Sequence, residues 1–339
     1  MKIKLMAYLH LGRVGMSPLT VSVPILGLFT AVSSSSPPLS QILVSGMIGF
    51  CAHLFGFALN DIIDYPIDKN SPYRQRSPLV TGKLSFRQAW VFVLLQPMLI
   101  LLLYWGGGDG TAVSFFILLL SFICSIAYNL WSKTGRIPRI FAELALASSV
   151  SLLCLASALT ISSIPSMATM VFACTLGLVT LLLNSVPSGL KDIKADREAG
   201  GNSFVLALGC FVIAGDRLYI SKKLQLFAFV LQTIIMGMVL FTAKQFFVPL
   251  MLQSIIFLLL TISFFHLIRM LMLSSYNQLR HGGPLLGGYC HYLALVLIVV
   301  SHFSIAQLLL VGLILLFVVA LTLLWRGVRR RRKLVFTGG

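Results

Sequence analysis

Acidic residues are scarce in this chain, which has nine Asp and Glu among 339 residues, against 26 Lys and Arg. Charged residues of both signs make up only 10% of the chain, and hydrophobic residues make up 58%. A soluble globular domain carries about 25% charged residues, so the composition excludes a protein of that class. It predicts an integral membrane protein that crosses the bilayer several times.

Paired cysteines are also lacking. The six cysteines are scattered through apolar segments, and no two of them form a C-x-x-C pair. This spacing excludes a disulfide framework and a cysteine-based zinc site, and it indicates small side chains used for packing.

Long apolar runs dominate the sequence. A helix needs roughly 20 apolar residues to cross a bilayer. Ten segments qualify, although the first is rich in Ser, Thr and Pro and the ninth is short. The predicted spans are about 17–35, 40–60, 87–105, 111–131, 138–161, 167–187, 224–242, 246–268, 286–302 and 304–325. We therefore predict an all-α fold, a polytopic bundle of nine to ten transmembrane helices.

The distribution of Lys and Arg predicts how this bundle lies in the membrane. With a cytoplasmic N-terminus, Lys244 alone falls on the outer face, as the positive-inside rule favours. Both termini and two long loops, residues 61–86 and 188–223, then face the cytoplasm or its equivalent, in a bacterial inner membrane or an organelle membrane. The loops are long enough to form a cap. We expect one membrane domain, residues 1–326, and a basic cytoplasmic tail, residues 327–339, that binds lipid and not nucleic acid.

Six of the nine acidic residues lie in two short clusters. The polar members are Asn60, Asp61, Asp64 and Asp68 in NDIIDYPID, and Asp192, Asp196 and Glu198 in KDIKADRE. The clusters follow the second and sixth predicted spans. This separation suggests two four-helix repeats, 17–131 and 138–268, that bring the clusters face to face over one cavity.

The spacing within each cluster predicts a metal site. On a helix of about 100° per residue, the four polar residues of the first cluster share a sector about 100° wide. Asp192 and Asp196, four positions apart, also share a face. Carboxylates this close repel one another unless cations neutralise them, and oxygen ligands suit Mg²⁺. We expect two Mg²⁺ ions that bridge a diphosphate. Nearby cations able to contact its oxygens include Arg74, Arg76, Lys191 and Arg197.

Both clusters resemble motifs of a known family. NDIIDYPID, followed by RSPLVTGKLS, is similar to the first motif of the UbiA-type intramembrane prenyltransferases, NDxxDxxxD with a downstream Pro and Gly. KDIKADREAG resembles their second aspartate motif, and the likeness spans about residues 15–300. It implies a helical bundle with a cap on the cytoplasmic or equivalent side. It also implies Mg²⁺-dependent transfer of a prenyl group from a prenyl diphosphate to a lipophilic, often aromatic, acceptor.

The resemblance assigns roles to individual residues. Tyr128 and Lys133 match a Tyr and a Lys that the family places after its fourth helix, so Tyr128 would face the reacting carbon and Lys133 would touch the diphosphate. Catalysis would rest on Asp64, Asp192 and Tyr128. The metal ligands or ligand partners would be Asn60, Asp64, Asp68, Asp192 and Asp196, with Asp61 supporting them.

Several residues depart from the family pattern. Pro66 lies inside the first motif and should end or kink the helix there, which can move Asp68 off the shared face. Ala195 stands where the second motif often has an Asp. Tyr128 and Lys133 are five positions apart and not the usual four, so Lys133 lies about 140° round a helix from Tyr128. These departures indicate a divergent member.

Two further polar residues are candidates for binding the acceptor. His53, seven residues before the first cluster, can orient or deprotonate an acceptor, or it can be a packed, hydrogen-bonded histidine. Glu143, near the inner end of the fifth predicted span, can bind the acceptor or pair with Arg139 or Arg136, because a bare carboxylate there is costly.

Three other functions compete with prenyl transfer. A terpene cyclase of the same fold would need no acceptor, because the prenyl cation would close on its own double bonds. Phosphosugar transfer to a polyprenyl phosphate would use a sugar diphosphate at the same site. A cation-coupled transporter would use the carboxylates for coupling, although coupling acids usually lie near the bilayer midplane and these lie at helix ends.

Overall fold

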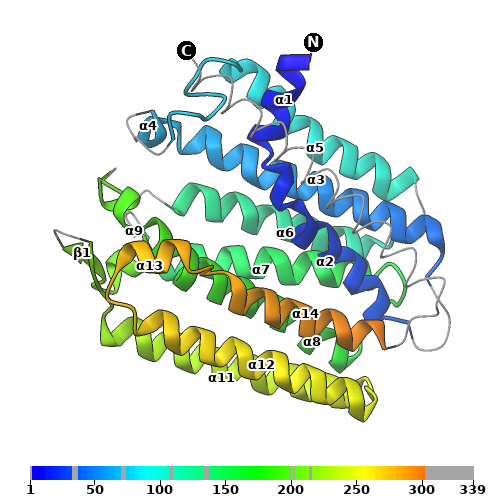
Figure 1. Ribbon diagram of the computed structural model, residues 1–339. Coiled ribbons are helices and arrows are strands. Elements are labelled where there is room, and N and C mark those ends of the chain that lie inside the picture. Colours follow the sequence, from blue (N-terminus) through cyan, green and yellow to red (C-terminus); the bar gives the residue numbers. More distant parts are fainter. Residues whose placement is uncertain are drawn as a thin grey trace.

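Figure 1 shows a bundle of long helices lying side by side, with short elements gathered at one end. The computed structural model describes residues 2–32, 37–69, 74–106, 110–132, 137–198, 200–201, 203–213 and 216–301. The predicted tenth span, 304–325, and the basic tail, 327–339, lie outside the described residues.

The described residues form eight helices long and apolar enough to cross a membrane, or nine if a bent N-terminal pair forms one span. They confirm the predicted class, and their limits lie within a few residues of the predicted spans. The helices are α3 (Leu39–Ile63), α5 (Phe86–Gly106), α6 (Ala112–Trp131), α7 (Arg139–Ala158), α8 (Met167–Leu183) continuing into α9 (Gly189–Glu198), α11 (Lys222–Gln245), α12 (Leu250–Leu271), and α13 (Tyr276–His281) continuing into α14 (Leu286–Val300).

The bent pair accounts for the first predicted span. Helix α1 (Lys2–Leu11) and helix α2 (Ser17–Thr30) are joined by a short 3-10 turn, Val14–Met16, and their axes differ by 41°. Arg13 lies at the bend with a left-handed backbone (φ 46°), a conformation that costs energy for a residue other than glycine. The contacts that hold this bend belong to the candidate site.

Close packing of α2 against α7 sets the centre of the bundle. A Cβ atom at Gly27 of α2 would overlap the carbonyl oxygen of Cys154 in α7. A Cβ atom at Gly177 of α8 would overlap the Ser151 hydroxyl oxygen and the Ala147 carbonyl oxygen of α7. Small residues at such contacts let membrane helices approach closely, where van der Waals packing drives their association. Helices α6 and α12 are less enclosed than α3, which suits helices that face lipid.

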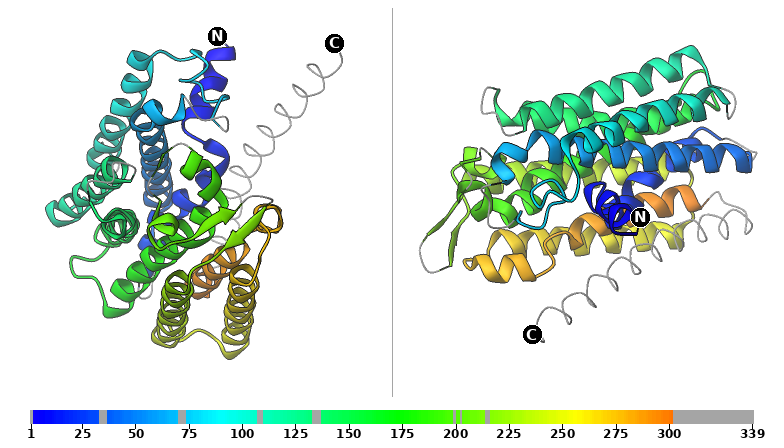
Figure 2. Two further views of the ribbon diagram at one scale, coloured as in Figure 1. Left: turned by 90° about the vertical axis from the view of Figure 1, so that its left-hand side faces the viewer. Right: turned by 90° about the horizontal axis from the view of Figure 1, so that it is seen from above.

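The short elements form the predicted cap at one end of the bundle. They are α4 (Tyr65–Asp68), α9, α10 (Phe204–Ala207), α13 and a hairpin of β1 (Phe211–Ile213) and β2 (Arg217–Tyr219), in which Val212 lies opposite Leu218. Figure 2 shows the hairpin at the same end as α4 and α9. The hairpin is the described exception to an all-α fold, and its three-residue strands are too short to be predicted from an alternating pattern.

Candidate active site

The first acidic cluster lies where α3 ends. The helix stops at Ile63, and Pro66 falls in the first turn of α4, where its missing N–H costs no hydrogen bond. The N–H of Asp64 still donates to the Asn60 carbonyl oxygen (2.9 Å), and the N–H of Asp68 donates to the carbonyl oxygen of Asp64 (2.8 Å). The predicted break at Pro66 is confirmed, and the chain stays coiled through it.

The carboxylates of this cluster are buried. Asp61, Asp64 and Asp68 are 5%, 1% and 3% exposed, while Asn60 is half-buried. A buried carboxylate is strongly destabilising unless a cation balances its charge. The negative charge of this cluster must therefore be balanced by cationic side chains, by a metal ion or by both.

Arg13 supplies that charge to Asp61. Its Nη2 atom lies 2.5 Å from Asp61 Oδ1, and its guanidinium group lies 5.0 Å from the centre of the Phe57 ring. His53 fixes the same bend, because its Nε2 lies 3.2 Å from the Arg13 carbonyl oxygen and its Nδ1 lies 3.1 Å from Thr20 Oγ1. His53 is 2% exposed, so these contacts account for a packed histidine. An acceptor role for His53 stays a prediction.

Arg74 supplies charge to Asp68. Its Nε lies 3.6 Å from Asp68 Oδ2, at a side chain 36% exposed. Arg76 is exposed two residues further on. Both residues lie in the segment after α4, so the structure places them at the same end of the bundle as the first cluster. Lys133 lies outside the described residues.

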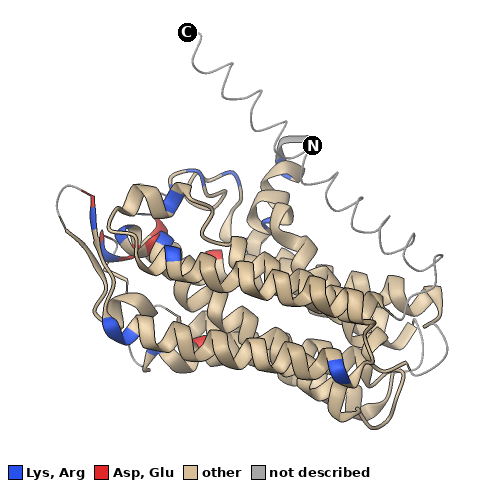
Figure 3. Ribbon diagram, turned by 60° about the horizontal axis from the view of Figure 1, so that its bottom comes forward, with Lys and Arg blue, Asp and Glu red and all other residues tan. Residues whose placement is uncertain are grey.

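The second acidic cluster lies on α9. Asp192 is exposed, with Lys191 Nζ 3.7 Å from its Oδ2, and Asp196 is half-buried. Two contacts attach this helix to the rest of the cap. Arg197 Nη1 donates a hydrogen bond to the Val212 carbonyl oxygen (3.2 Å). The Tyr276 hydroxyl donates one to the Lys191 carbonyl oxygen (2.7 Å). Figure 3 shows the described Asp and Glu residues gathered towards one end of the bundle, with many of the described Lys and Arg residues at the same end.

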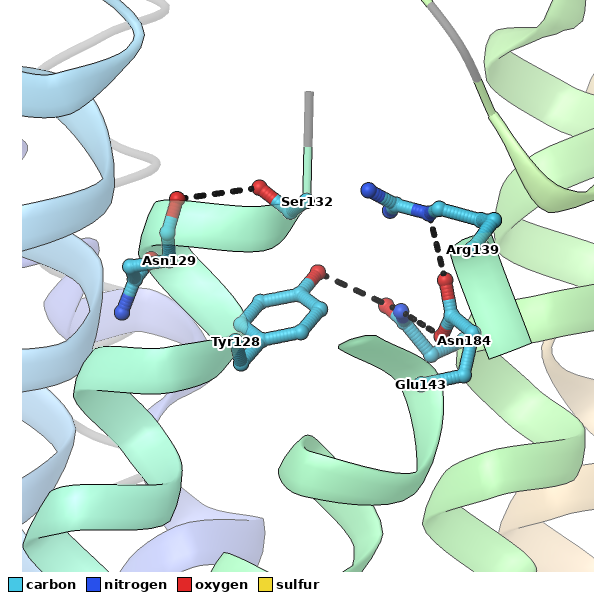
Figure 4. A network of polar contacts seen from close by, with 6 residues as sticks. All are labelled: Tyr128, Asn129, Ser132, Arg139, Glu143 and Asn184. Carbon is cyan, nitrogen blue, oxygen red and sulfur yellow. Dashed lines mark hydrogen bonds and ion pairs between the residues drawn. The ribbon is translucent and has the colours of Figure 1, made fainter. Parts of the chain in front are cut away.

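A polar network lies deeper, between α6, α7 and the end of α8 (Figure 4). Arg139 Nε donates to Glu143 Oε1 (3.0 Å), as the pairing alternative predicts. The Asn184 amide donates to Glu143 Oε2 (2.6 Å) and to the Tyr128 hydroxyl oxygen (3.2 Å). Asn184 also begins the turn that leads into α9, so this network adjoins the helix that carries the second cluster.

Asn184 is a site residue that the sequence reasoning missed. It begins a π-helical turn, Asn184–Ser188, which contains Pro187 and links α8 to α9. The available signal was Asn184 with a proline three positions later, at the end of an apolar run. The π-helical turn found there is of a kind that is frequent at functional sites.

The donor set fits a hard divalent cation. Its members are carboxylate and amide oxygens, which Mg²⁺ prefers. In the part of the chain that the structure describes, no three His, Cys, Asp or Glu side chains gather around one point. Mg²⁺ usually keeps water and substrate phosphate oxygens among its ligands, so a few carboxylates from each cluster match what it needs from a protein.

Apolar spanning helices with a polar site at one end define a multi-pass integral membrane protein. The sequence profile of the UbiA prenyltransferase family matches residues 21–270. The chain therefore belongs to this family, and the resemblance drawn from its two motifs is confirmed. No protein with a curated description matches the chain.

Solved structures share the fold. A UbiA homolog from Archaeoglobus fulgidus bound to GPP and Mg²⁺ is 16% identical, with 87% of this chain and 99% of that chain covered and a TM-score of 0.61. An apo UbiA homolog from Aeropyrum pernix K1 is 15% identical, with 84% of this chain and 96% of that chain covered and a TM-score of 0.61. A structure described as digeranylgeranylglyceryl phosphate synthase is 17% identical, with 89% of this chain and 99% of that chain covered and a TM-score of 0.54.

Proposed function

We propose that this protein transfers a prenyl group from a prenyl diphosphate to a lipophilic, aromatic acceptor in an Mg²⁺-dependent reaction and releases pyrophosphate. One observation carries the proposal: two acidic clusters lie at the same end of an apolar bundle whose sequence belongs to a prenyltransferase family. The bundle supplies an environment for the prenyl chain, and the clusters supply one for a metal diphosphate.

The metal ligands proposed are Asn60, Asp64 and Asp68 on one side and Asp192 and Asp196 on the other. Two Mg²⁺ ions held there would neutralise the negative charge that develops on the departing diphosphate. Asp61 supports the set indirectly, since its carboxylate is paired with Arg13. The binding of GPP and Mg²⁺ by the Archaeoglobus homolog supports this assignment by analogy of fold.

Basic residues of the cap would bind the diphosphate oxygens. Arg74 is half-exposed beside Asp68, so its guanidinium can turn from that carboxylate to a phosphate oxygen. Lys191 and Arg197 on α9 and Arg76 after α4 can approach the same group, and Lys133 is proposed from its place in the family pattern.

The reaction breaks the allylic C–O bond, and the electron pair leaves with pyrophosphate. The acceptor carbon or oxygen then bonds to the allylic carbon and loses a proton. The apolar residues of the bundle keep water from the reactive carbon. Tyr128, half-buried in the last turn of α6, is proposed to face that carbon.

The proposal is tested by measuring pyrophosphate release from the purified protein with Mg²⁺ and prenyl diphosphates of ten to twenty carbons. The assay is run with and without a lipid-extract acceptor pool. Release that requires the pool, with a coupled product of matching mass, is the expected result. Release without the pool, giving a cyclic hydrocarbon or alcohol, would instead identify a cyclase. No release in either case would shift the assignment to phosphosugar transfer or transport.

A further inference from the structure

Arg139, the first residue of α7, is a buried cation in the polar network. Its side chain is 10% exposed, its Nε donates to Glu143 Oε1, and its guanidinium carbon lies 5.9 Å from the centre of the Tyr128 ring. Figure 4 shows the guanidinium group extending from α7 to the side on which Tyr128 lies. Two contacts therefore fix its orientation, one through a hydrogen bond and one through the aromatic face.

Glu143 and Tyr128 have their acceptor oxygens occupied. Glu143 is 1% exposed, and its two oxygens receive Arg139 Nε and the Asn184 amide. The Tyr128 oxygen also receives the Asn184 amide, so the Tyr128 hydroxyl keeps its own hydrogen for donation. Glu143 and Asn184 thus act as positioning residues, because they hold Arg139 and Tyr128 in place through hydrogen bonds.

One buried nitrogen of Arg139 has no partner in the part of the chain that the structure describes. Nη1 is buried and has no hydrogen-bond partner among the described residues. A buried N–H group without a partner is costly, and such groups in native proteins often belong to a ligand site. Arg139 Nη1 and the Tyr128 hydroxyl are thus two donors that the network offers to an oxygen from outside it.

The net charge of the network indicates which kind of ligand oxygen these donors bind. Arg139 is already neutralised by Glu143, so the pair adds no net charge to the site. A diphosphate is better matched by exposed cations of the cap such as Arg76 and Arg197, whereas an uncharged pair with two donors suits a single carbonyl or phenolic oxygen. We propose that Arg139 and Tyr128 bind a carbonyl or phenolic oxygen of the acceptor, an inference that rests on the function proposed above. This pair of residues then determines which acceptors the protein uses.

A site built to hydrogen-bond a substrate oxygen rejects analogues that lack it, because its own donors are then left unpaired. Acceptors with a ring oxygen at the matching position are therefore bound, and hydrocarbons of the same shape are not. Asn184 of the network begins the turn that leads into α9, so an acceptor held there lies near the helix proposed to hold the diphosphate end of the prenyl chain.

Two variants separate recognition from folding. Arg139→Lys keeps a cation beside Glu143 but has no planar second donor. The double variant Arg139→Gln/Glu143→Gln removes both buried charges together, so that neither is left unpaired. Lys222→Gln, at an exposed position in the first turn of α11, is the control for loss of one charge. Full-length proteins are assayed with Mg²⁺, farnesyl diphosphate and the lipid extract.

Each substrate is titrated with the other saturating. We expect both Arg139 variants to raise the half-saturating amount of extract about tenfold or more, and to leave that of farnesyl diphosphate within about twofold of wild type. A rise for farnesyl diphosphate instead, or no rise for either substrate, would overturn the assignment. If the wild-type protein itself shows no turnover that requires the extract, the proposed function fails, and this outcome is visible before any variant is compared.

Discussion

The hydroxyl of Tyr276 donates a hydrogen bond of 2.7 Å to the main-chain carbonyl oxygen of Lys191, directly before Asp192. Tyr276 begins α13, which is also joined to the hairpin: Asp216 caps α13 by accepting from the Ser275 hydroxyl (2.6 Å) and from the Asn277 N–H (3.0 Å). The position of the second acidic cluster therefore depends on contacts from a helix 85 residues further along the chain.

The first prediction concerns this contact. Tyr276→Phe keeps the buried ring and removes the hydrogen bond, so it should lower the free energy of unfolding by about 0.5–1.5 kcal/mol. The Mg²⁺ concentration for half-maximal activity should rise by about 3- to 10-fold, because a ligand helix is less well held. Tyr219→Phe, at an exposed position on β2, is the matched control. Unchanged Mg²⁺ dependence in Tyr276→Phe would contradict the role of this bond.

The second prediction concerns the carboxylates. Asp64→Asn and Asp192→Asn should each lower the rate by roughly 100-fold or more, since each removes a proposed metal ligand. Glu198→Gln removes an exposed acid from the same helix as Asp192 and should stay near wild type. Chelation of divalent ions should abolish turnover, and added Mg²⁺ should restore it. Near-normal turnover in either Asp variant would refute the metal assignment.

The third prediction separates pairing from metal binding at Asp61. Asp61→Asn leaves Arg13 without its partner and should cost about 1–3 kcal/mol of unfolding free energy. In the double variant Arg13→Gln/Asp61→Asn, the loss should be smaller than the sum of the two single losses, which a double-mutant cycle measures. Mg²⁺ dependence should stay close to wild type in the double variant. A strong rise in the Mg²⁺ requirement would show that Asp61 is itself a ligand.

The fourth prediction tests the packing of α2 on α7. Gly27→Val places side-chain atoms against the backbone at Cys154 and should destabilise the fold by about 1–3 kcal/mol, because a packed contact accepts added volume poorly. Gly237→Ala is the control, since nothing lies within 4 Å of a Cβ there, and an alanine in a helix is favoured over glycine by about 1 kcal/mol. Thermal unfolding in detergent measures both, and equal melting temperatures would contradict the close approach.

Much of the fold could be predicted because bilayer thickness and composition limit it tightly. Runs of apolar residues reveal the spans, and Pro66 reveals a helix break from its missing N–H alone. The pairing of Arg13 with Asp61 could not be predicted in the same way, since the two residues are 48 positions apart and meet only through the bend between α1 and α2. A helical wheel groups Asp61 with its neighbours on α3 and carries no information about that bend.

The network around Glu143 shows the same limit. The pairing with Arg139 is local, four residues along one helix, and was one of two alternatives open from the sequence. The hydrogen bond from Asn184 to the Glu143 carboxylate depends on how α8 packs against α7. A local sequence pattern therefore cannot predict it. Sidedness of the membrane, the four-helix repeats and the acceptor role of His53 stay predictions.

The continuous run from Met167 to Glu198 has a consequence for where chemistry takes place. Its 32 residues, at 1.5 Å per residue, measure about 48 Å, whereas the hydrocarbon layer is about 30 Å thick. We therefore expect the end of the run that holds Asp192 and Asp196 to lie at the level of the lipid headgroups. An amphiphile with a charged head and a long tail already rests at that depth, so a prenyl diphosphate could slide sideways from the membrane onto the carboxylates without leaving its leaflet.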